Sequence, residues 1–203
     1  GLKPGLKAMV QPPAFAGSAE LVAISRIAEK AAGQVELIFA LPVAQPADAV
    51  GDALVLTKPL GTGTLFAALP QNQVKGRWIS QALRCMTQSN APAAQCLQTH
   101  GAKACTDVTG FGLLGHLVEM TRPSKVDAVL QLEALPLLDG AAECLERGIV
   151  SSLHQANTRM ASALAYASGH TDTLQKNARY QALFDPQTAG GLLAGIPQAN
   201  AAA

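Results

Sequence analysis

The sequence predicts an α/β (or α+β) fold in which helices cover a mixed β-sheet. Segments with strand patterns alternate along the chain with segments of helical periodicity, and this order is typical of a sheet covered by helices. Of the 203 residues, 49% are hydrophobic but only 4% are aromatic, so the core has to be built from Leu, Val, Ile and Ala. We divide the chain into residues 1–48, an unassigned helix–strand extension or fusion remnant, and residues 49–203, a single domain.

The first 48 residues differ in character from the rest. Ser18 is a good N-cap and Gly33 a good C-cap, so a helix is predicted between them. Residues 34–42, "QVELIFALP", then have the pattern of a strand. A stretch rich in Pro, Ala and Asp, residues 43–52, follows as a connector.

The elements of the second part follow in order. Strands are predicted at residues 53–58, 102–108, 126–134 and 192–197, the third because apolar and polar residues alternate there. Helices are predicted at residues 76–90, 91–101, 111–121 (ended by Pro123), 135–148 and about 161–167.

Charge and cysteine content restrict the class of protein. The net charge is +1, from 15 basic and 14 acidic residues, which disfavours a nucleic-acid partner. The longest apolar runs are too short to cross a membrane. The four cysteines have no zinc-site spacing, and Cys105 and Cys144 lie in apolar patterns that favour buried, reduced side chains. We therefore expect a soluble, cytoplasmic protein.

The stretch "CTDVTGFGLLGHL", residues 105–117, carries the strongest candidate site. Its three glycines have the order G-x-G-x-x-G between a predicted strand and a predicted helix, where backbone N–H groups can bind phosphate. A dinucleotide site would use Glu133, at the end of the next predicted strand. Asp107 argues instead for a magnesium ion with a polyphosphate, because carboxylates near phosphates usually act through a metal. A purely structural glycine turn stays open. The candidate residues are Asp107 for the metal, and Thr106, Thr109, Gly110 and Gly112 for the cofactor.

Two further segments contain glycines next to a predicted strand. "FDPQTAGG", residues 184–191, fits either a binding loop or a tight turn into a strand. "LTKPLGTGTL", residues 56–65, resembles a phosphate cradle but lacks the G-K-[ST] order of a P-loop, so Lys58 is interpreted as a solvated lysine beside a turn. His116 is interpreted as a capping or packing residue, and His154 and His170 as loop residues. No Ser-His-Asp arrangement is inferred.

Five segments together resemble the selenophosphate synthetase family, also called selenide, water dikinases, of the aminoimidazole ribonucleotide synthetase superfamily. They are "GDALVLTKPLGTGTLFAA", "ACTDVTGFGLLGHLVEM", "LEALPLLDGA", "GIVSSLHQANTR" and "LFDPQTAGGLLAGIP", and they span residues 51–197. The resemblance implies two α/β domains with ATP and Mg²⁺ between them. It also implies formation of selenophosphate from selenide, ATP and water, with release of AMP and phosphate. Asp107 matches the family's magnesium-binding aspartate, so the glycines are assigned to an ATP-using enzyme.

The first 48 residues depart from the family pattern. The family's catalytic Cys or selenocysteine, its nearby Lys, its other metal-binding aspartates and its Gly-Gly-His-Thr motif have no match there. We therefore expect that the N-terminal ATP-binding domain is missing, that the C-terminal end is incomplete, and that the chain is inactive alone, with no catalytic residue of its own. The alternatives are a non-catalytic binding or interaction module and a dinucleotide-binding domain. The resemblance leaves a homodimer open.

Overall fold

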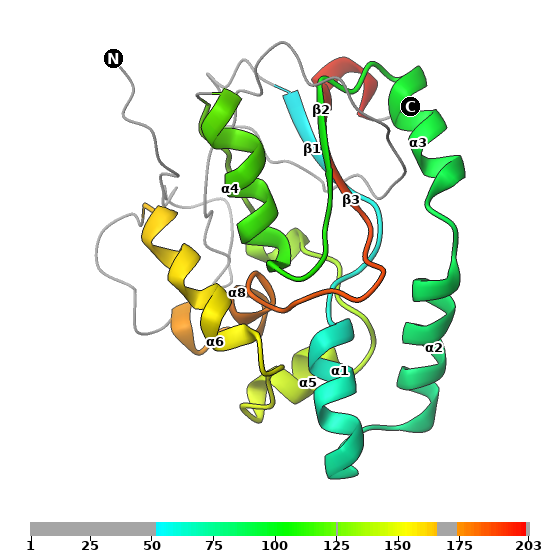
Figure 1. Cartoon of the computed structure of the whole chain (residues 1–203), viewed down its shortest axis with the longest axis vertical. Helices are drawn as coiled ribbons and strands as arrows, with labels where there is room; N and C mark the ends of the chain where they lie inside the picture. The colour runs from blue at the N-terminus through cyan, green and yellow to red at the C-terminus, as the bar shows by residue number, and fades with distance from the viewer. Residues whose placement is uncertain (1–51, 125, 166–173, 202–203) are drawn as a thin grey trace.

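The computed structural model describes residues 52–124, 126–165 and 174–201, and these form a three-stranded sheet with helices around it (Figure 1). The strands are β1 (Asp52–Leu56), β2 (Ala104–Asp107) and β3 (Leu192–Pro197), in the order β1-β3-β2. Both β1 and β2 pair antiparallel with β3. The α/β class is confirmed, but the described strands make an antiparallel sheet rather than a mixed one. β1 and β2 run parallel to each other, and the last strand of the chain is inserted between them.

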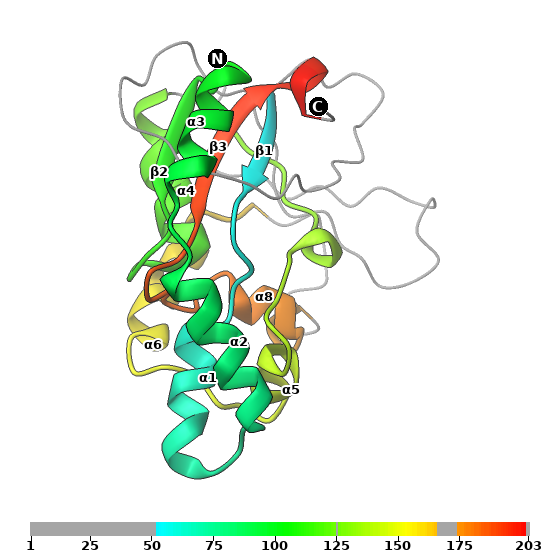
Figure 2. The same ribbon diagram turned by 90° about the vertical axis from the view of Figure 1, so that its right-hand side faces the viewer.

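Both faces of the sheet are covered, because its strands are apolar on both sides. Leu54, Leu56 and Leu193 belong to the main core with α4 (Gly112–Ser124). Their neighbours in the sequence face the other way, where Leu97 of α3 (Ala91–Thr99) packs on them. The two views in Figures 1 and 2 show α3 and α4 on opposite sides of the sheet. Strands buried on both faces need apolar residues at consecutive positions, as in "ALVL".

A second core lies among the helices below the sheet (Figure 2). It joins α1 (Thr62–Ala68), α2 (Gly76–Thr87) and α5 (Ala141–Glu146), with the 3₁₀ helix η1 (Leu69–Gln71) extending α1. Trp78 is 3% exposed at its centre. Gly140 has φ +80°, and a Cβ there would lie 2.2 Å from Cδ2 of Trp78. Only glycine therefore fits between the tryptophan and the start of α5.

The remaining elements are short. They are the 3₁₀ helices η2 (Leu132–Ala134), η3 (Thr158–Ala163) and η4 (Gln198–Asn200), and the helices α6 (His154–Asn157) and α8 (Ala178–Ala182). Both α6 and η3 contact α4. Asn157 ties this region to the chain on either side of it, because its Nδ2 donates to the carbonyl oxygens of Gly110 (2.9 Å) and Phe184 (3.0 Å).

Most predicted elements of the second part are confirmed, with shifted ends. The strands predicted at 53–58, 102–108 and 192–197 are β1, β2 and β3, and the helices at 76–90, 91–101 and 111–121 are α2, α3 and α4. α4 includes Pro123 and ends at the next residue, so the proline lies inside its last turn. The helix and strand predicted within residues 1–48 lie outside the described residues.

Three predictions after α4 are wrong in whole or in part. Residues 126–134 are not a strand of the sheet. Ala128, Leu130 and Leu132 are buried, as the alternation indicates, but their segment ends in η2 and packs on the main core beside the sheet. The helix predicted at 135–148 shortens to α5, because the chain first pairs with Leu60 at Leu137. Residues 161–163 of the helix predicted at 161–167 belong to η3, which is 3₁₀ rather than α, and the described residues 164 and 165 lie beyond its end.

Candidate functional site

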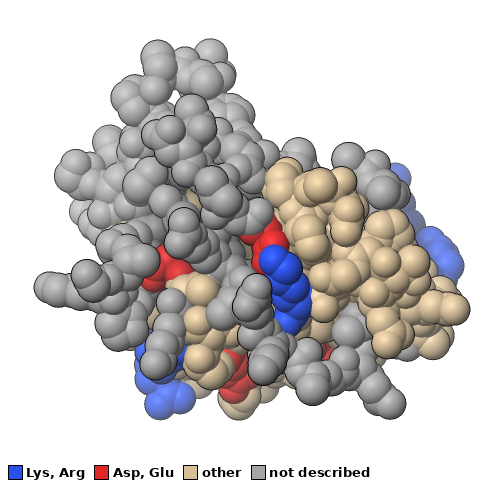
Figure 3. All heavy atoms as spheres, turned by 90° about the horizontal axis from the view of Figure 1, so that it is seen from above, with Lys and Arg blue, Asp and Glu red and all other residues tan. Residues whose placement is uncertain are grey.

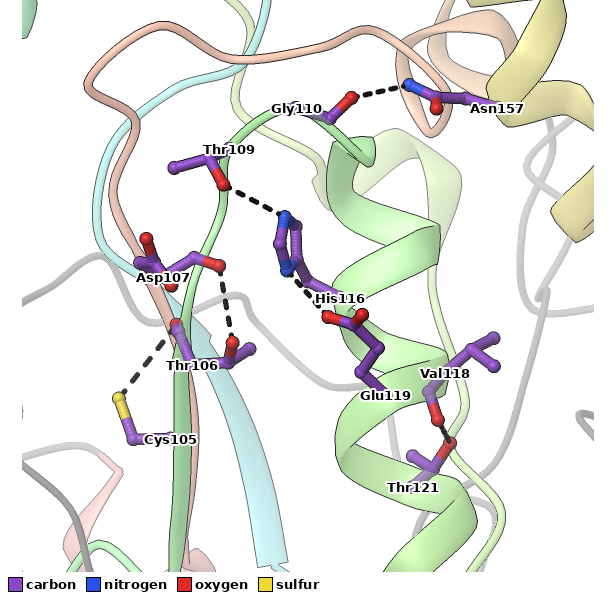
Figure 4. A network of polar contacts seen from close by, with 10 residues as sticks. All are labelled: Cys105, Thr106, Asp107, Thr109, Gly110, His116, Val118, Glu119, Thr121 and Asn157. Atoms are coloured by element: carbon purple, nitrogen blue, oxygen red, sulfur yellow. Dashed lines mark hydrogen bonds and ion pairs between the residues drawn. The ribbon is translucent and has the colours of Figure 1, made fainter.

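The candidate site is the loop between β2 and α4, shown in Figure 4. Asp107 is the last residue of β2 and lies opposite Leu192 of β3. It is exposed, and its carboxylate makes no hydrogen bond or ion pair with any described residue. In Figure 4 this carboxylate is drawn on the side of the strand away from α4. Thr106 is half-buried, and its hydroxyl donates to the carbonyl oxygen of Asp107 (3.3 Å). The strand therefore presents one exposed, unpaired carboxylate at its end.

Two carbonyl groups of the loop, those of Thr109 and Gly110, accept hydrogen bonds from other residues of the protein. The Thr109 carbonyl oxygen accepts from the amides of Gly112 (3.1 Å) and Gln187 (2.9 Å), and that of Gly110 accepts from Asn157. In contrast, the amides of Thr109, Gly110 and Phe111 make no hydrogen bond within the described part of the chain. A Cβ added at Gly110 would meet nothing within 4 Å. Successive unpaired amides beside an open glycine are an arrangement that binds anions.

The other two glycines of the motif are packing residues. Gly112 is buried with φ +69°, and a Cβ there would lie 2.8 Å from the carbonyl oxygen of Leu183. That oxygen also accepts from the amide of Leu114 (3.0 Å), so the first turn of α4 is occupied by the chain itself. At Gly115 a Cβ would lie 2.6 Å from Cβ of Phe111. The G-x-G-x-x-G pattern thus combines one open glycine with two that permit close packing.

His116 connects the loop to α4. It is buried, and its Nε2 lies 3.2 Å from Oγ1 of Thr109 while its Nδ1 lies 3.1 Å from Oε2 of Glu119 (Figure 4). The ring of Phe111, which is 57% exposed, lies 5.5 Å from the imidazole. The interpretation of His116 as a packing residue is confirmed by its burial, but the hydroxyl–imidazole–carboxylate arrangement was missed. The i,i+3 spacing of His116 and Glu119 was the available signal.

Asp107 has the chemistry that Mg²⁺ prefers, but it stands apart from other ligands. Mg²⁺ takes oxygen ligands, typically one or two carboxylates together with water and phosphate oxygens. Across the described ranges, no group of three or more His, Cys, Asp or Glu side chains could hold a metal ion. An exposed, unpaired carboxylate next to free amides fits a metal held together with a phosphate.

The arrangement needed for a dinucleotide site does not occur in the described ranges. Glu133 lies in η2 rather than at the end of a strand after α4, and its Oε2 is 3.5 Å from Nε of Arg179. The described sheet is also antiparallel, whereas dinucleotide folds have a largely parallel one.

The segment 56–65 is not a phosphate cradle, and the interpretation of Lys58 as solvated is wrong. Lys58 is 5% exposed. Its Nζ donates to the carbonyl oxygens of Gln88 (2.8 Å) and Ala189 (3.2 Å), which come from the end of α2 and the segment before β3. A buried ammonium group needs such acceptors. These two hydrogen bonds connect the segment after β1, the end of α2 and the segment before β3.

The amides at the start of α1 are bound by segment 184–191 rather than left open to a ligand. Oε1 of Gln187 accepts from the amides of Gly61 (3.1 Å) and Thr62 (3.3 Å) and from the Thr62 hydroxyl (3.1 Å). The amide of Gly63 donates to the carbonyl oxygen of Pro186 (3.1 Å). Helix α1 has no capping side chain at its own N-cap, so these distant groups satisfy its free amides. We call this arrangement the Gln187 cap.

Asp185 completes the Gln187 cap as a buried carboxyl group. It is 0% exposed and accepts from the Thr64 hydroxyl (2.7 Å) and from Nε2 of Gln187 (2.9 Å). Burial raises its pKa to about 6, an effect reduced by hydrogen bonds from Thr64, Gln187 and the amide of Gly63. A turn that resembles a phosphate site is thus filled by the protein's own carboxyl group.

The glycines that end segment 184–191 allow three chain segments to cross. A Cβ at Gly190 would lie 2.1 Å from the carbonyl oxygen of Val108, and one at Gly191 would lie 2.4 Å from the amide nitrogen of Lys58. The sequence left two interpretations of this segment, a binding loop and a tight turn into a strand, and the structure supports the tight turn. The segment also holds the candidate loop, because the amide of Val108 donates to the carbonyl oxygen of Gly191 (2.8 Å) and the amide of Gln187 donates to that of Thr109.

The predictions for the cysteines and the remaining histidines are met in part. Cys144 is buried as predicted, whereas Cys105 is only half-buried. His154 is buried in α6 rather than placed in a loop, and His170 lies outside the described residues. None of the helices in the described ranges is both long and apolar enough to span a membrane. On the described part of the face in Figure 3, acidic and basic residues are scattered, without a field of one sign.

Residues 49–203 match the family described as "AIR synthase related protein, C-terminal domain". The chain belongs to this family. Its relatives include selenide, water dikinases, so the predicted resemblance is confirmed. It is 42% identical over 147 residues to the selenide, water dikinase of Geobacter metallireducens, an alignment that covers 70% of this chain and 40% of the relative.

Other relatives carry the same name. The chain is 33% identical to selenide, water dikinase 2 of Peptoclostridium acidaminophilum (75% of this chain, 43% of the relative). It is 38% identical to the selenide, water dikinase of Burkholderia cenocepacia (73% and 41%). The alignments therefore span about two-fifths of the length of these curated relatives.

Proposed function

We propose that residues 49–203 act as the C-terminal domain of an ATP-dependent selenophosphate synthetase, which converts selenide, ATP and water into selenophosphate, AMP and phosphate. The family and the printed names of the relatives support the reaction class. One structural observation carries the assignment of the site. The exposed carboxylate of Asp107 lies two residues before the amides of Thr109, Gly110 and Phe111, and none of these groups has a hydrogen-bonding partner among the described residues.

In this proposal each candidate residue has a distinct role. Asp107 contributes a carboxylate oxygen to Mg²⁺, which when bound would spread the negative charge of the phosphates. The amides of Thr109 and Gly110 donate to phosphate oxygens. Thr106 orients the end of β2 through its hydrogen bond to the carbonyl oxygen of Asp107. Gly112 lets α4 start against Leu183 and so supports the loop without touching the ligand.

The domain holds metal and phosphate in this proposal and does not supply the nucleophile. The Cys or selenocysteine and the Lys that the resemblance implies have no counterpart in the segment before the domain. We therefore expect this chain alone to release no AMP from ATP in the presence of selenide. Selenide-dependent AMP release by the purified chain would contradict this division of roles.

We expect Asp107→Ala to weaken binding of magnesium–ATP about tenfold or more, because loss even of a group that only orients a metal ligand costs that much. Calorimetric titration of the full chain measures the effect. The fold should be unchanged, since Asp107 is exposed and its carboxylate has no partner among the described residues. The matched control is Asp139→Ala, which removes an exposed carboxylate elsewhere. Equal binding by the parent chain and Asp107→Ala would remove Asp107 from the site.

Two glycine substitutions should separate binding from packing. Gly110→Ala should change the free energy of unfolding by less than about 0.5 kcal/mol, because its Cβ meets no atom within 4 Å, yet weaken magnesium–ATP binding because the methyl group occupies the space before the amides. Gly112→Ala should cost about 2 kcal/mol of stability, because of its positive φ and its contact with Leu183. Urea unfolding and calorimetry on both variants measure this. A stable Gly110→Ala variant with unchanged affinity would contradict the anion site.

A further inference from the structure

A series of hydrogen-bonded side chains, Thr109–His116–Glu119, leads from the candidate loop to the surface of the protein (Figure 4). The Thr109 hydroxyl lies 3.2 Å from Nε2 of His116, whose Nδ1 lies 3.1 Å from Oε2 of Glu119. The His116 side chain is 7% exposed, whereas that of Glu119 is 57% exposed. Neither His116 nor Glu119 has a role in the function proposed above.

The order of groups determines where the protons lie. A carboxylate offers only acceptor oxygens, so Glu119 requires the proton of His116 on Nδ1. In the neutral imidazole the other ring nitrogen, Nε2, is then an acceptor, and its partner has to be the O–H donor of Thr109. The Thr109 hydroxyl is thereby turned toward α4, and its proton is not available to a ligand.

This hydrogen bond adds a third anchor to one loop residue. The Thr109 carbonyl oxygen already accepts from Gly112 and Gln187. The side chain and the carbonyl group of Thr109 are thus both bound within the protein, and its amide is the backbone group that has no partner among the described residues. The same holds for Gly110, whose carbonyl oxygen is bound by Asn157.

We propose that His116 is a positioning residue, held by Glu119 in its Nδ1–H form and accepting the Thr109 hydroxyl, so that the loop keeps its amides available to an oxyanion such as a phosphate group. The identity of the ligand rests on the function proposed above. The tautomer of His116 and its effect on the loop are independent of that function.

The tautomer is tested by nitrogen NMR on the ¹⁵N-labelled full chain. Long-range ¹H–¹⁵N spectra show which ring nitrogen of His116 carries the proton, with the signals assigned by their loss in His116→Gln. The proposal requires the Nδ1–H form in the parent chain and growth of the Nε2–H form in Glu119→Ala. It requires no change in Glu119→Gln, whose side-chain oxygen still accepts. An Nε2–H form in the parent chain would overturn the proposal.

The effect on the loop is tested on the same samples. Backbone amide signals of Thr109, Gly110 and Phe111 should shift in Glu119→Ala, but not in Glu119→Gln or in Glu146→Ala, a matched loss of an exposed glutamate in α5. Because Glu119 is largely exposed, these variants should fold. Unchanged loop signals in Glu119→Ala would show that His116 only fills space.

Binding separates this proposal from the proposed function. With magnesium–ATP as the probe, the dissociation constant should rise about fivefold in Glu119→Ala, the worth of about one hydrogen bond, and return to the parent value in Glu119→Gln. If the parent chain binds but Glu119→Ala binds equally well, the positioning role is wrong. If the parent chain shows no binding, the proposed function of this chain fails, and the two NMR measurements still decide the role of His116.

Discussion

Gln187→Leu should lower the free energy of unfolding by about 4 kcal/mol, a large part of the stability of a typical domain. The side chain is 4% exposed, so water cannot replace it. Its oxygen is the acceptor for two amides and one hydroxyl at the start of α1, and its nitrogen donates to Asp185. Leucine fills a similar volume but leaves these donors buried without a partner, and each such group costs about 1–3 kcal/mol.

Urea unfolding followed by the fluorescence of Trp78 measures this loss, because Trp78 is the single tryptophan and lies in the core beside α1. The control is Gln98→Leu, which makes the same change at an exposed position of α3. The control should differ from the parent by less than about 0.5 kcal/mol. Similar unfolding midpoints for Gln187→Leu and Gln98→Leu would mean that the Gln187 cap contributes little to stability.

The strands could be predicted because their signal is local, whereas their arrangement could not. A run such as "ALVL" indicates a strand buried on both faces, whatever its neighbours are. The position of β3 between β1 and β2 depends on pairing between residues more than 80 positions apart, for example Ala104 with Gly195. In residues 126–134 the alternation predicted the buried side chains correctly, but a strand also needs a neighbour with free hydrogen-bonding groups, and this requirement is not local.

The part of the candidate site that lies within the single motif of residues 105–117 could be predicted from the sequence. The position of Asp107 at the end of a strand and the opening at Gly110 follow from consecutive residues. The motif does not show that Gly110 is open whereas Gly112 is packed. Glycine is used both where a ligand needs access to the backbone and where two segments pack closely, so the residue type alone does not separate the two cases. The sequence did not single out Gln187, because its partners at the start of α1 lie 125 and 126 positions away. The local sequence at the start of a helix does not show whether its free amides are bound by another part of the protein or by a phosphate.

Asp185 should make the stability of this protein fall as the pH rises through the range from about 4 to 6. Its pKa in the folded state is raised from 3.8 to about 6 by burial. The folded protein therefore binds a proton more tightly than the unfolded chain does, and the stabilisation is complete below the unfolded pKa and lost above the folded one. The difference of about two pKa units corresponds to about 3 kcal/mol, of which about 2 kcal/mol falls between about pH 4.5 and pH 7.

The measurement is the difference in unfolding free energy between the parent chain and Asp185→Asn, followed by urea unfolding across that pH range. Asparagine cannot titrate, so the difference should shift in favour of the parent by about 2 kcal/mol toward the acidic end, whatever the offset between the two proteins at neutral pH. Burial lowers the pKa of His154, which makes stability rise with pH instead, but His154 is present in both proteins and cancels in the difference. Parallel curves would show that Asp185 titrates alike in the folded and unfolded states. The hydrogen bonds from Thr64, Gln187 and the amide of Gly63 would then offset its burial fully. Asp185 within the Gln187 cap would in that case be an ordinary ionised carboxylate, and its negative charge would stand in for the phosphate that a turn of this kind can bind.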